Sequence, residues 1–201
     1  MHPNPAFCAD DQAAMLQWAA ATGFAHVVLH TTEGLMAAHV PIVQAGERAV
    51  RFHIARANRV FTHLDGAAVV ASIAGADGYV TPNWYGDPAN QVPTWNYVAV
   101  ELYGTARAIG EEALVEQLDA LAAAHEPRVS PERPWTRAKM AEARFGAMLR
   151  AIAGFEIAID TVRATRKLSQ NKPPQDRACI IAGLENCGRA ELAETMRSTK
   201  L

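Results

Sequence analysis

The sequence predicts an α+β protein built around a mostly antiparallel barrel with peripheral helices. Six segments with strand character, joined by short turns, come before the helical segments of the chain. This order disfavours alternating strand–helix–strand units. Hydrophobic residues make up 50% of the 201 residues and charged residues 20%, as in an ordinary globular protein. A chain of this length can bury its core without a disulfide or a structural metal.

The first elements are a helix and three strands. A helix is expected at about 11–22, with Asp10 and Asp11 as acidic caps and Gly23 as its end. The segments FAHVVLHTT, LMAAHVPIV and RAVRFHIA follow as strands, separated by turns. In the third strand, apolar and polar residues alternate, which indicates one buried face.

Three further strands complete the expected barrel. A short helix or turn, NRVFTHL, leads into AAVVASIAG, which is apolar on both faces and therefore predicted to be central. GYVTP is expected to be a fifth strand. TWNYVAVELYGTARAIG is expected to be a long sixth strand, in which Gly104 marks a bulge or the close approach of another backbone.

Helices dominate the next part of the chain. EEALVEQLDALAAAHE is strongly periodic and begins with acidic residues, which suit a helix N-terminus. Prolines are expected to end it, and a second helix is expected at about 137–153. GFEIAIDTV should be a seventh strand, 163–177 a polar loop, and RAELAETMRS a last helix. We therefore expect one domain over 1–201, with helical additions at about 111–153 and a helical tail at about 188–200.

Charge and cysteine content limit the class of protein. The net charge is −2, the pI is about 6.4, and the chain lacks the basic excess of a dedicated nucleic-acid binder. Three cysteines without a C-x-x-C pair favour a reduced, cytoplasmic protein. The N-terminus does not resemble a signal peptide, and no apolar run is long enough for a membrane span.

The segment RFHIARANR, at residues 51–59, is a candidate phosphate site. His53, Arg56, Asn58 and Arg59 follow one another at the end of a strand. Arginine offers a two-pronged donor to phosphate, and a turn into a helix presents backbone N–H groups. A solvated polar turn would show the same residues. The glycine patterns of P-loop and Rossmann sites are absent from the sequence.

The segment YVTPNWYGDPANQVPTWNYVAV, at residues 79–100, holds five of the fourteen Phe, Trp and Tyr residues. Aromatic rings and nearby polar side chains can line a slot for a planar ligand. The polar candidates are Thr81, Asn83, Thr94 and Asn96. A hydrophobic plug at a barrel end or a subunit interface would explain the aromatics equally well.

A third candidate segment is KLSQN, at residues 167–171. Lys167 suits an anion, and Ser169, Gln170 and Asn171 suit the amide-like edge of a ligand; an exposed loop is the alternative. The seven histidines show no metal-binding motif, so no metal site is predicted.

Five segments together resemble one protein family. HIARAN, YVTPNWY, VPTWNYVAVELYG, GFEIAI and RKLSQN, in this order and spacing, are similar to the PaiB family of bacterial flavin-binding negative transcriptional regulators. The H-P-x-x-x-F opening at 2–7 and the H-x-P at 39–41 also match. The resemblance extends from about residue 2 to the segment at 180–184.

The resemblance implies a split β-barrel of the flavin-reductase and pyridoxamine-oxidase type. It implies a homodimer with FMN at the subunit interface, the phosphate near 53–58 and the flavin ring near the aromatic segment. Arg59 departs from the proline expected after HIARAN. The implied flavin contacts are His53, Arg56, Asn58, Tyr79, Thr81, Thr94, Trp95, Asn96, Lys167 and Gln170.

Three functions remain open on these grounds. The resemblance favours an FMN-binding negative transcriptional regulator. An FMN-dependent oxidoreductase is the alternative, because fold does not fix function, and a haem-handling protein is a third. The sequence has no helix-turn-helix. If DNA is bound, the candidate contacts are Arg137, Lys139, Arg144, Arg150 and the segment 163–177.

Overall fold

The computed structural model describes residues 2–9 and 11–199. Over these residues, six strands close a barrel in the order β1-β2-β3-β6-β5-β4. The chain divides into two compact units. We call residues 13–73 and 101–162 the barrel unit, and residues 1–12, 74–100 and 163–201 the hairpin unit. The strands are β1 (Phe24–Thr31), β2 (Gly34–Gln44), β3 (Ala49–Ala55), β4 (Ala68–Val80), β5 (Thr94–Ala108) and β6 (Ile152–Lys167).

The start of the barrel unit follows the sequence pattern closely. The helix α1 (Gln12–Thr22) ends at Gly23, whose φ of 78° is the left-handed conformation expected there. The Gly23 N–H donates to the Ala19 carbonyl at 3.0 Å. Asp10, one of its expected caps, lies outside the described residues. The strands β1 and β2 pair antiparallel around Gly34, and their side chains alternate between buried and exposed.

The core of the barrel unit forms where β3 pairs with β6. Val50, Phe52 and Ile54 are buried, as their alternation predicts. Ala55 lies opposite Ile152 at the end of the antiparallel pairing. The Phe52 and Phe155 rings stack with centroids 5.6 Å apart. This pairing joins segments about a hundred residues apart in the chain, and it brings Arg56 beside the start of β6.

Two predictions about the strands were tested by β4 and β5. Gly104 of β5 does lie against another backbone, because an added Cβ would meet the carbonyl oxygen of Ala158 in β6. The prediction of separate fourth and fifth strands was wrong, since β4 runs unbroken from Ala68 to Val80. It is not buried on both faces either. Its small residues alternate between buried and more exposed positions like those of the other strands.

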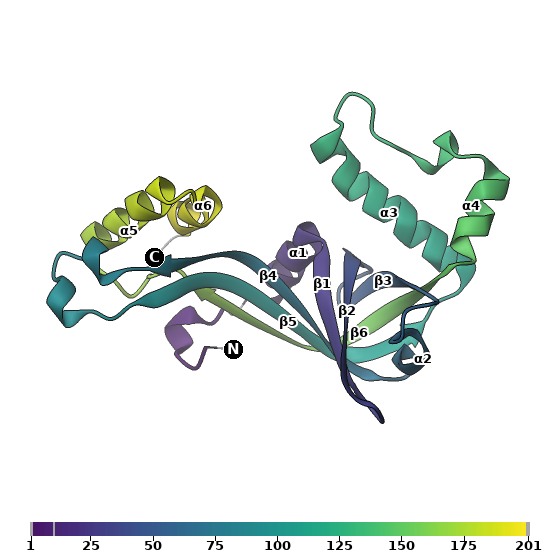
Figure 1. The fold of residues 1–201 in the computed structure, drawn as a ribbon, viewed down its shortest axis with the longest axis horizontal. Helices are drawn as coiled ribbons and strands as arrows, with labels where there is room; N and C mark the ends of the chain where they lie inside the picture. The colour runs from purple at the N-terminus through teal and green to yellow at the C-terminus, as the bar shows by residue number, and fades with distance from the viewer. Residues whose placement is uncertain (1, 10, 200–201) are drawn as a thin grey trace. The chain divides into compact units, whose positions relative to one another are not determined.

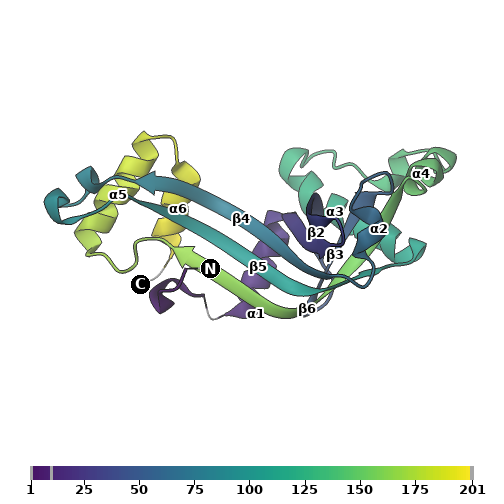
Figure 2. The same ribbon diagram turned by 60° about the horizontal axis from the view of Figure 1, so that its bottom comes forward.

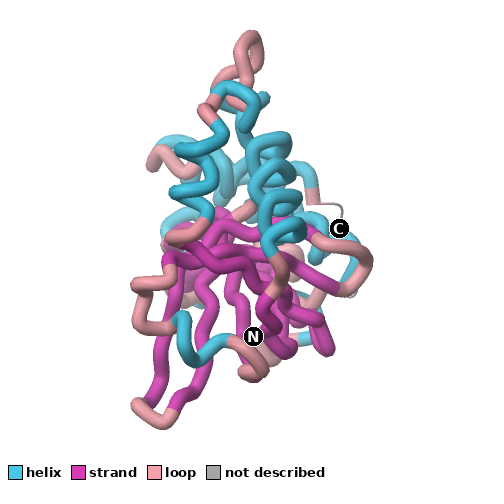
Figure 3. Tube along the Cα trace, turned by 90° about the vertical axis from the view of Figure 1, so that its right-hand side faces the viewer, coloured by secondary structure: helices cyan, strands magenta, loops and turns pink. Residues whose placement is uncertain are grey.

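The helices of the barrel unit differ from the predicted ones at their ends. The helix α3 (Glu111–Val129) continues through Pro127, which was expected to break it. Only two residues follow Pro127, so a single hydrogen bond near the C-terminus is lost. The second helix, α4 (Glu142–Leu149), is shorter than the predicted 137–153, because β6 already begins at Ile152. The helices α3 and α4 project from the same end of the barrel unit (Figures 1 and 3).

The hairpin unit contains the far ends of β4, β5 and β6 and two helices, α5 (Pro174–Asn186) and α6 (Ala190–Ser198). These helices lie side by side against the β4–β5 hairpin (Figures 1 and 2). Gly78 of β4 leaves room for Leu184 and Leu192, and Gly183 leaves room for the Trp84 ring. Within the described residues, no helix has the length and apolar character needed to cross a membrane.

The segment 163–177 is not the polar loop that was predicted. The strand β6 extends to Lys167, with Ala164 and Thr165 buried between more exposed arginines. The helix α5, which was not predicted, begins at Pro174. Proline suits the first turn of a helix because its missing N–H is not needed there. The predicted C-terminal helix is confirmed as α6.

Candidate functional site

The predicted phosphate segment lies at the end of β3 in the barrel unit. His53 is half-buried, and its Nδ1 lies 3.0 Å from Nε2 of Gln117 on α3. Burial lowers the pKa of His53, which favours the neutral ring. Asn58 holds the following turn, because its Oδ1 accepts a hydrogen bond from the Val60 N–H at 3.0 Å. Both side chains therefore already have a partner, and their predicted roles toward a ligand stay predictions.

Arg56 has a different environment. Its guanidinium lies over the Phe61 ring, 5.4 Å from the centroid. Together with Arg150, it lines a cavity of about 330 Å³ that also includes Glu111 and Gly154. Among the described residues, no ion pair engages either arginine. Two guanidinium groups beside one cavity can bind a phosphate through charge-assisted hydrogen bonds.

The β3–β6 pairing brings the two arginines together. Ala55 pairs with Ile152, and the Arg56 N–H donates to the Ala151 carbonyl at 2.9 Å. Arg150 therefore follows the strand register to a place beside Arg56. In the sequence it was considered only as a DNA contact. The signal that would have found it is the pairing of two distant strands, which composition and spacing do not show.

The hairpin unit brings three of the predicted residues to a second cavity. Thr94, Asn96 and Lys167 line about 180 Å³ of space. Lys167 Nζ donates to the Thr94 hydroxyl, and burial lowers the pKa of Lys167. Asn96 is fully buried, and its Nδ2 donates to Ser169 Oγ at 2.9 Å. This cavity is smaller than the roughly 300 Å³ at the lower end of small-molecule sites, so it fits a polar ligand edge better than a whole flavin ring.

Trp95 lies on the opposite face of β5 from Thr94 and Asn96, because successive side chains of a strand alternate. It packs edge-to-face with Tyr79 of β4, with ring centroids 6.2 Å apart. Both rings are about half exposed, at 50% for Trp95 and 49% for Tyr79. Half-exposed aromatic rings of this size favour a partner, either a planar ligand or another protein surface.

Two predicted residues hold turns in the hairpin unit. Thr81 Oγ1 accepts from the Asn83 N–H at 3.3 Å at the start of a short 3₁₀ turn. Gln170 Oε1 accepts from the Leu168 N–H at 2.8 Å, and its Nε2 donates to the Ala6 carbonyl at 2.9 Å. These bonds stabilise the turn after β6, where Ser169 adopts a φ of 56°.

Sequence reasoning missed one cluster near the second cavity. Lys172 Nζ lies 4.9 Å from the centroid of the buried Tyr85 ring and donates to Gln91 Oε1 at 2.7 Å. Burial raises the pKa of Tyr85; the nearby Asp176 carboxylate raises it further, and a hydrogen bond with Ser169 lowers it. The NKPP sequence alone gave no reason to place Lys172 over a ring.

The closed six-stranded antiparallel barrel has the fold of a split-barrel protein. The chain belongs to the family described as "Putative FMN-binding domain", whose model matches residues 1–161. This membership confirms the predicted cofactor, FMN, and the resemblance drawn from the five segments.

The chain is similar to several known proteins. It is 31% identical over 131 residues to "Protease synthase and sporulation protein PAI 2" of Bacillus subtilis, covering 64% of this chain and 61% of that one. It is 33% identical over 122 residues to an uncharacterized protein of Emericella nidulans, covering 55% of this chain and 49% of that one. The matches thus span about half to three-fifths of these two relatives.

Solved structures support the fold. A flavocytochrome from Azotobacter vinelandii superposes with a TM-score of 0.62 at 19% identity, covering 89% of this chain and 78% of that one. An FAD and haem binding protein from Mycobacterium smegmatis gives a TM-score of 0.56 at 20% identity, covering 83% and 78%. At these identities the likeness concerns the fold, and it confirms the predicted split barrel.

Proposed function

We propose that the protein binds FMN non-covalently, acts as a negative transcriptional regulator and works in the cytoplasm. Family membership supports the flavin. The similarity to a protein named for protease synthesis and sporulation supports the regulatory role. Bound FMN would supply electron- and hydride-transfer chemistry, which suits a regulator that responds to redox state as well as an enzyme.

The observation that carries the cofactor proposal is that Arg56 and Arg150 line the same cavity. Their cavity of about 330 Å³ is open, and no ion pair among the described residues occupies the two guanidinium groups. A doubly charged phosphate is the ligand that two such groups favour. We assign the FMN phosphate to this cavity. Glu111 also lines this cavity, and its carboxylate disfavours any negative charge beyond that of the phosphate.

The flavin ring of an FMN whose phosphate is held by a second copy of the chain is assigned to the exposed Tyr79–Trp95 pair. The edge-to-face pair leaves ring surface open to a planar partner. A homodimer with the flavin at its interface, as the sequence predicts, would cover this surface from a second copy. The polar residues Thr94 and Lys167 lie on the other face of β5, so a ring on the aromatic pair does not contact them.

The test separates the phosphate from the ring by comparing FMN with riboflavin, which lacks the phosphate. Replacing a charged hydrogen-bond donor should cost about tenfold or more in affinity. We expect Arg56→Gln and Arg150→Gln each to weaken FMN binding by about that factor and to leave riboflavin binding unchanged, measured by flavin fluorescence titration. Arg144→Gln is the matched control, because Arg144 is an exposed arginine on α4, the helix whose C-terminal end Arg150 follows.

Two other results would overturn parts of the proposal. Equal loss of FMN and riboflavin affinity in Arg150→Gln would mean that the arginine supports the fold and not the phosphate. Absence of binding to either flavin in the wild type would remove the cofactor from the account. Rapid NADH oxidation by the flavin-loaded protein would favour the oxidoreductase alternative.

The regulatory half of the proposal is tested with DNA. Arg144 is exposed, whereas Arg137 pairs with Asp119 and Lys139 donates to the Pro134 carbonyl at 2.8 Å. Few free cations therefore remain on this helical region. If the protein binds DNA directly, a specific gel shift should weaken steeply as salt rises. Binding that is insensitive to salt, or absent with and without flavin, would contradict direct DNA recognition.

A further inference from the structure

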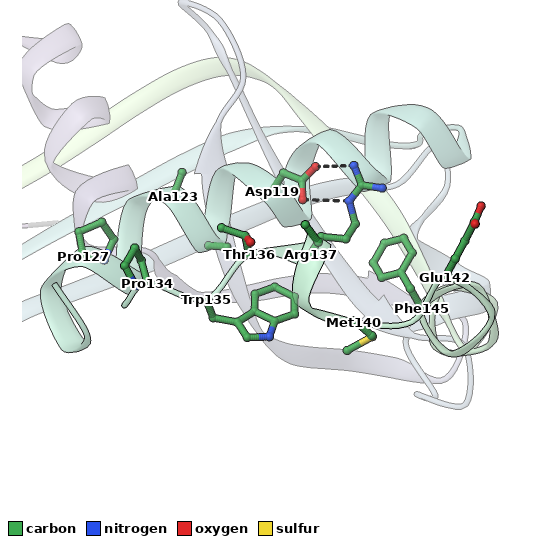
Figure 4. A pocket seen from close by; sticks show the side chains of 12 residues that line it. Asp119, Ala123, Pro127, Pro134, Trp135, Thr136, Arg137, Met140, Glu142 and Phe145 are labelled. Atoms are coloured by element: carbon green, nitrogen blue, oxygen red, sulfur yellow. Dashed lines mark hydrogen bonds and ion pairs between the residues drawn. The ribbon is translucent and has the colours of Figure 1, made fainter. Parts of the chain in front are cut away.

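The helix α3, the segment after it and α4 line another cavity of the barrel unit, which is larger than the Arg56–Arg150 cavity. Its volume of about 740 Å³ falls within the range of about 300–1,000 Å³ for small-molecule sites. It shares no lining residue with the Arg56–Arg150 cavity. Its large apolar side chains are Trp135, Met140 and Phe145 (Figure 4). Nothing in the proposed flavin function uses this cavity.

Specific contacts hold the cavity open. The Trp135 N–H donates to Glu126 Oε2 of α3 at 2.8 Å. Arg137 pairs with Asp119 of α3 through two hydrogen bonds of 3.2 and 3.1 Å, drawn in Figure 4. The segment between α3 and α4, which includes a short 3₁₀ helix at Arg137–Lys139, is therefore attached to α3 at two points. The lining of α3 also includes Ala122 and Ala123, whose short side chains leave room between the walls.

The charges that line the cavity do not balance. Arg137 neutralises Asp119, but Glu142, in the first turn of α4, makes no ion pair with any described residue. Arg137 also lies over the Phe145 ring, 5.3 Å from its centroid. Trp135 is 38% exposed and is the aromatic side chain that remains without such a cation. An open indole ring and an unpaired carboxylate together favour a positively charged, apolar guest.

We propose that this cavity binds a lipophilic organic cation, meaning an ammonium or phosphonium group that carries aromatic or aliphatic substituents. Trp135 contacts the cation and its apolar substituents, and Glu142, at the far edge of the cavity in Figure 4, supplies the opposite charge at longer range. A neutral or anionic molecule of the same shape would gain the apolar contact but lose both electrostatic interactions. The inference does not depend on flavin binding and stands or falls separately from it.

The test uses two probes of nearly the same shape and opposite charge, tetraphenylphosphonium and tetraphenylborate. We expect calorimetry on the full chain to show binding of the phosphonium and at least about tenfold weaker binding of the borate. Trp135→Ala should weaken phosphonium binding about tenfold, and Glu142→Gln about threefold, as for a partly exposed charge. Glu132→Gln is the control, because Glu132 is exposed on the same segment and does not line the cavity.

Three results would overturn the proposal. The borate could bind as tightly as the phosphonium, or Trp135→Ala and Glu142→Gln could bind the phosphonium like the wild type. The third result is that the phosphonium does not bind and that sedimentation shows a wild-type dimer, which Trp135→Ala dissociates. That last result would mean that a second copy of the chain covers the cavity. Thermal melting of each variant separates loss of the site from loss of the fold.

Discussion

Trp95 shows how strand geometry divides residues that lie together in the sequence. Thr94, Trp95 and Asn96 are consecutive, and all three are predicted flavin contacts. Alternation along β5 places Trp95 with Tyr79 on one face and turns Thr94 and Asn96 to the other. One planar ring cannot lie against both faces of the same strand. We therefore propose that the ring of an FMN held by a second copy of the chain packs on the exposed aromatic pair.

Replacing Trp95 by alanine should weaken the binding of FMN and of riboflavin to the same extent, by about tenfold, because the two ligands share the flavin ring. The folded protein should lose little stability, since Trp95 is half exposed. Flavin titration and urea unfolding measure the two effects. Leu35→Ala is the control, because Leu35 is 74% exposed and lines neither of the two candidate ligand cavities. Unchanged flavin affinity together with loss of a dimer in sedimentation would make the aromatic pair a subunit contact instead.

His53 gives a prediction about pH. Burial lowers its pKa in the folded protein below the ordinary value of 6.5, so the unfolded chain binds the proton more tightly. The free energy of unfolding should therefore fall as pH drops through 6.5 toward the lowered pKa of the folded state. We expect His53→Gln to lose less of its urea midpoint than the wild type between about pH 7 and about pH 5.

The matched control for this prediction is His30→Gln, because His30 is exposed on β1. That variant should keep the wild-type dependence on pH. Identical dependence in the wild type and in His53→Gln would show that burial does not suppress protonation of His53.

At the scale of elements, close contact between β5 and β6 depends on Gly104. An added Cβ would meet the Ala158 carbonyl, which is backbone and cannot rotate away. Gly104→Ala should reduce the free energy of unfolding by about 2–3 kcal/mol. Gly146→Ala should instead raise it by about 0.5–1 kcal/mol, because Gly146 lies within α4 and an added Cβ would lie 3.6 Å from the Arg150 side chain, an ordinary van der Waals contact. Equal effects of the two substitutions in urea unfolding would contradict the close approach.

Elements with a clear period were predictable, and elements that depend on tertiary contact were not. The alternation of apolar and polar residues predicted β3, and glycines predicted the C-terminal end of α1 and the turn between β1 and β2. The polar segment after Val162 gave no sign of a strand, yet β6 continues there with Ala164 and Thr165 buried. The helix α5 was missed because its polar start, PPQDR, resembles a loop. Its apolar residue Leu184 packs against Gly78 of β4, a contact that the sequence does not show.

At the scale of the whole molecule, the sequence motifs led to the family but did not give the layout of the site. The motifs identified a flavin-binding split barrel, which the family match confirms. His53, Arg56 and Asn58 lie in the barrel unit, whereas the other predicted contacts lie in the hairpin unit. Arg150 enters through the pairing of β3 with β6, and only the folded chain reveals it.

Whether the protein carries FMN is best measured by the visible absorption spectrum of the purified protein, followed by heat release and identification of the chromophore. We expect flavin bands, or their appearance after added FMN, and release of FMN with its phosphate intact. A protein that is colourless and takes up no FMN would contradict it, and the Tyr79–Trp95 pair would then be a surface for another protein. A haem-type band would redirect the search from the arginines to the histidines.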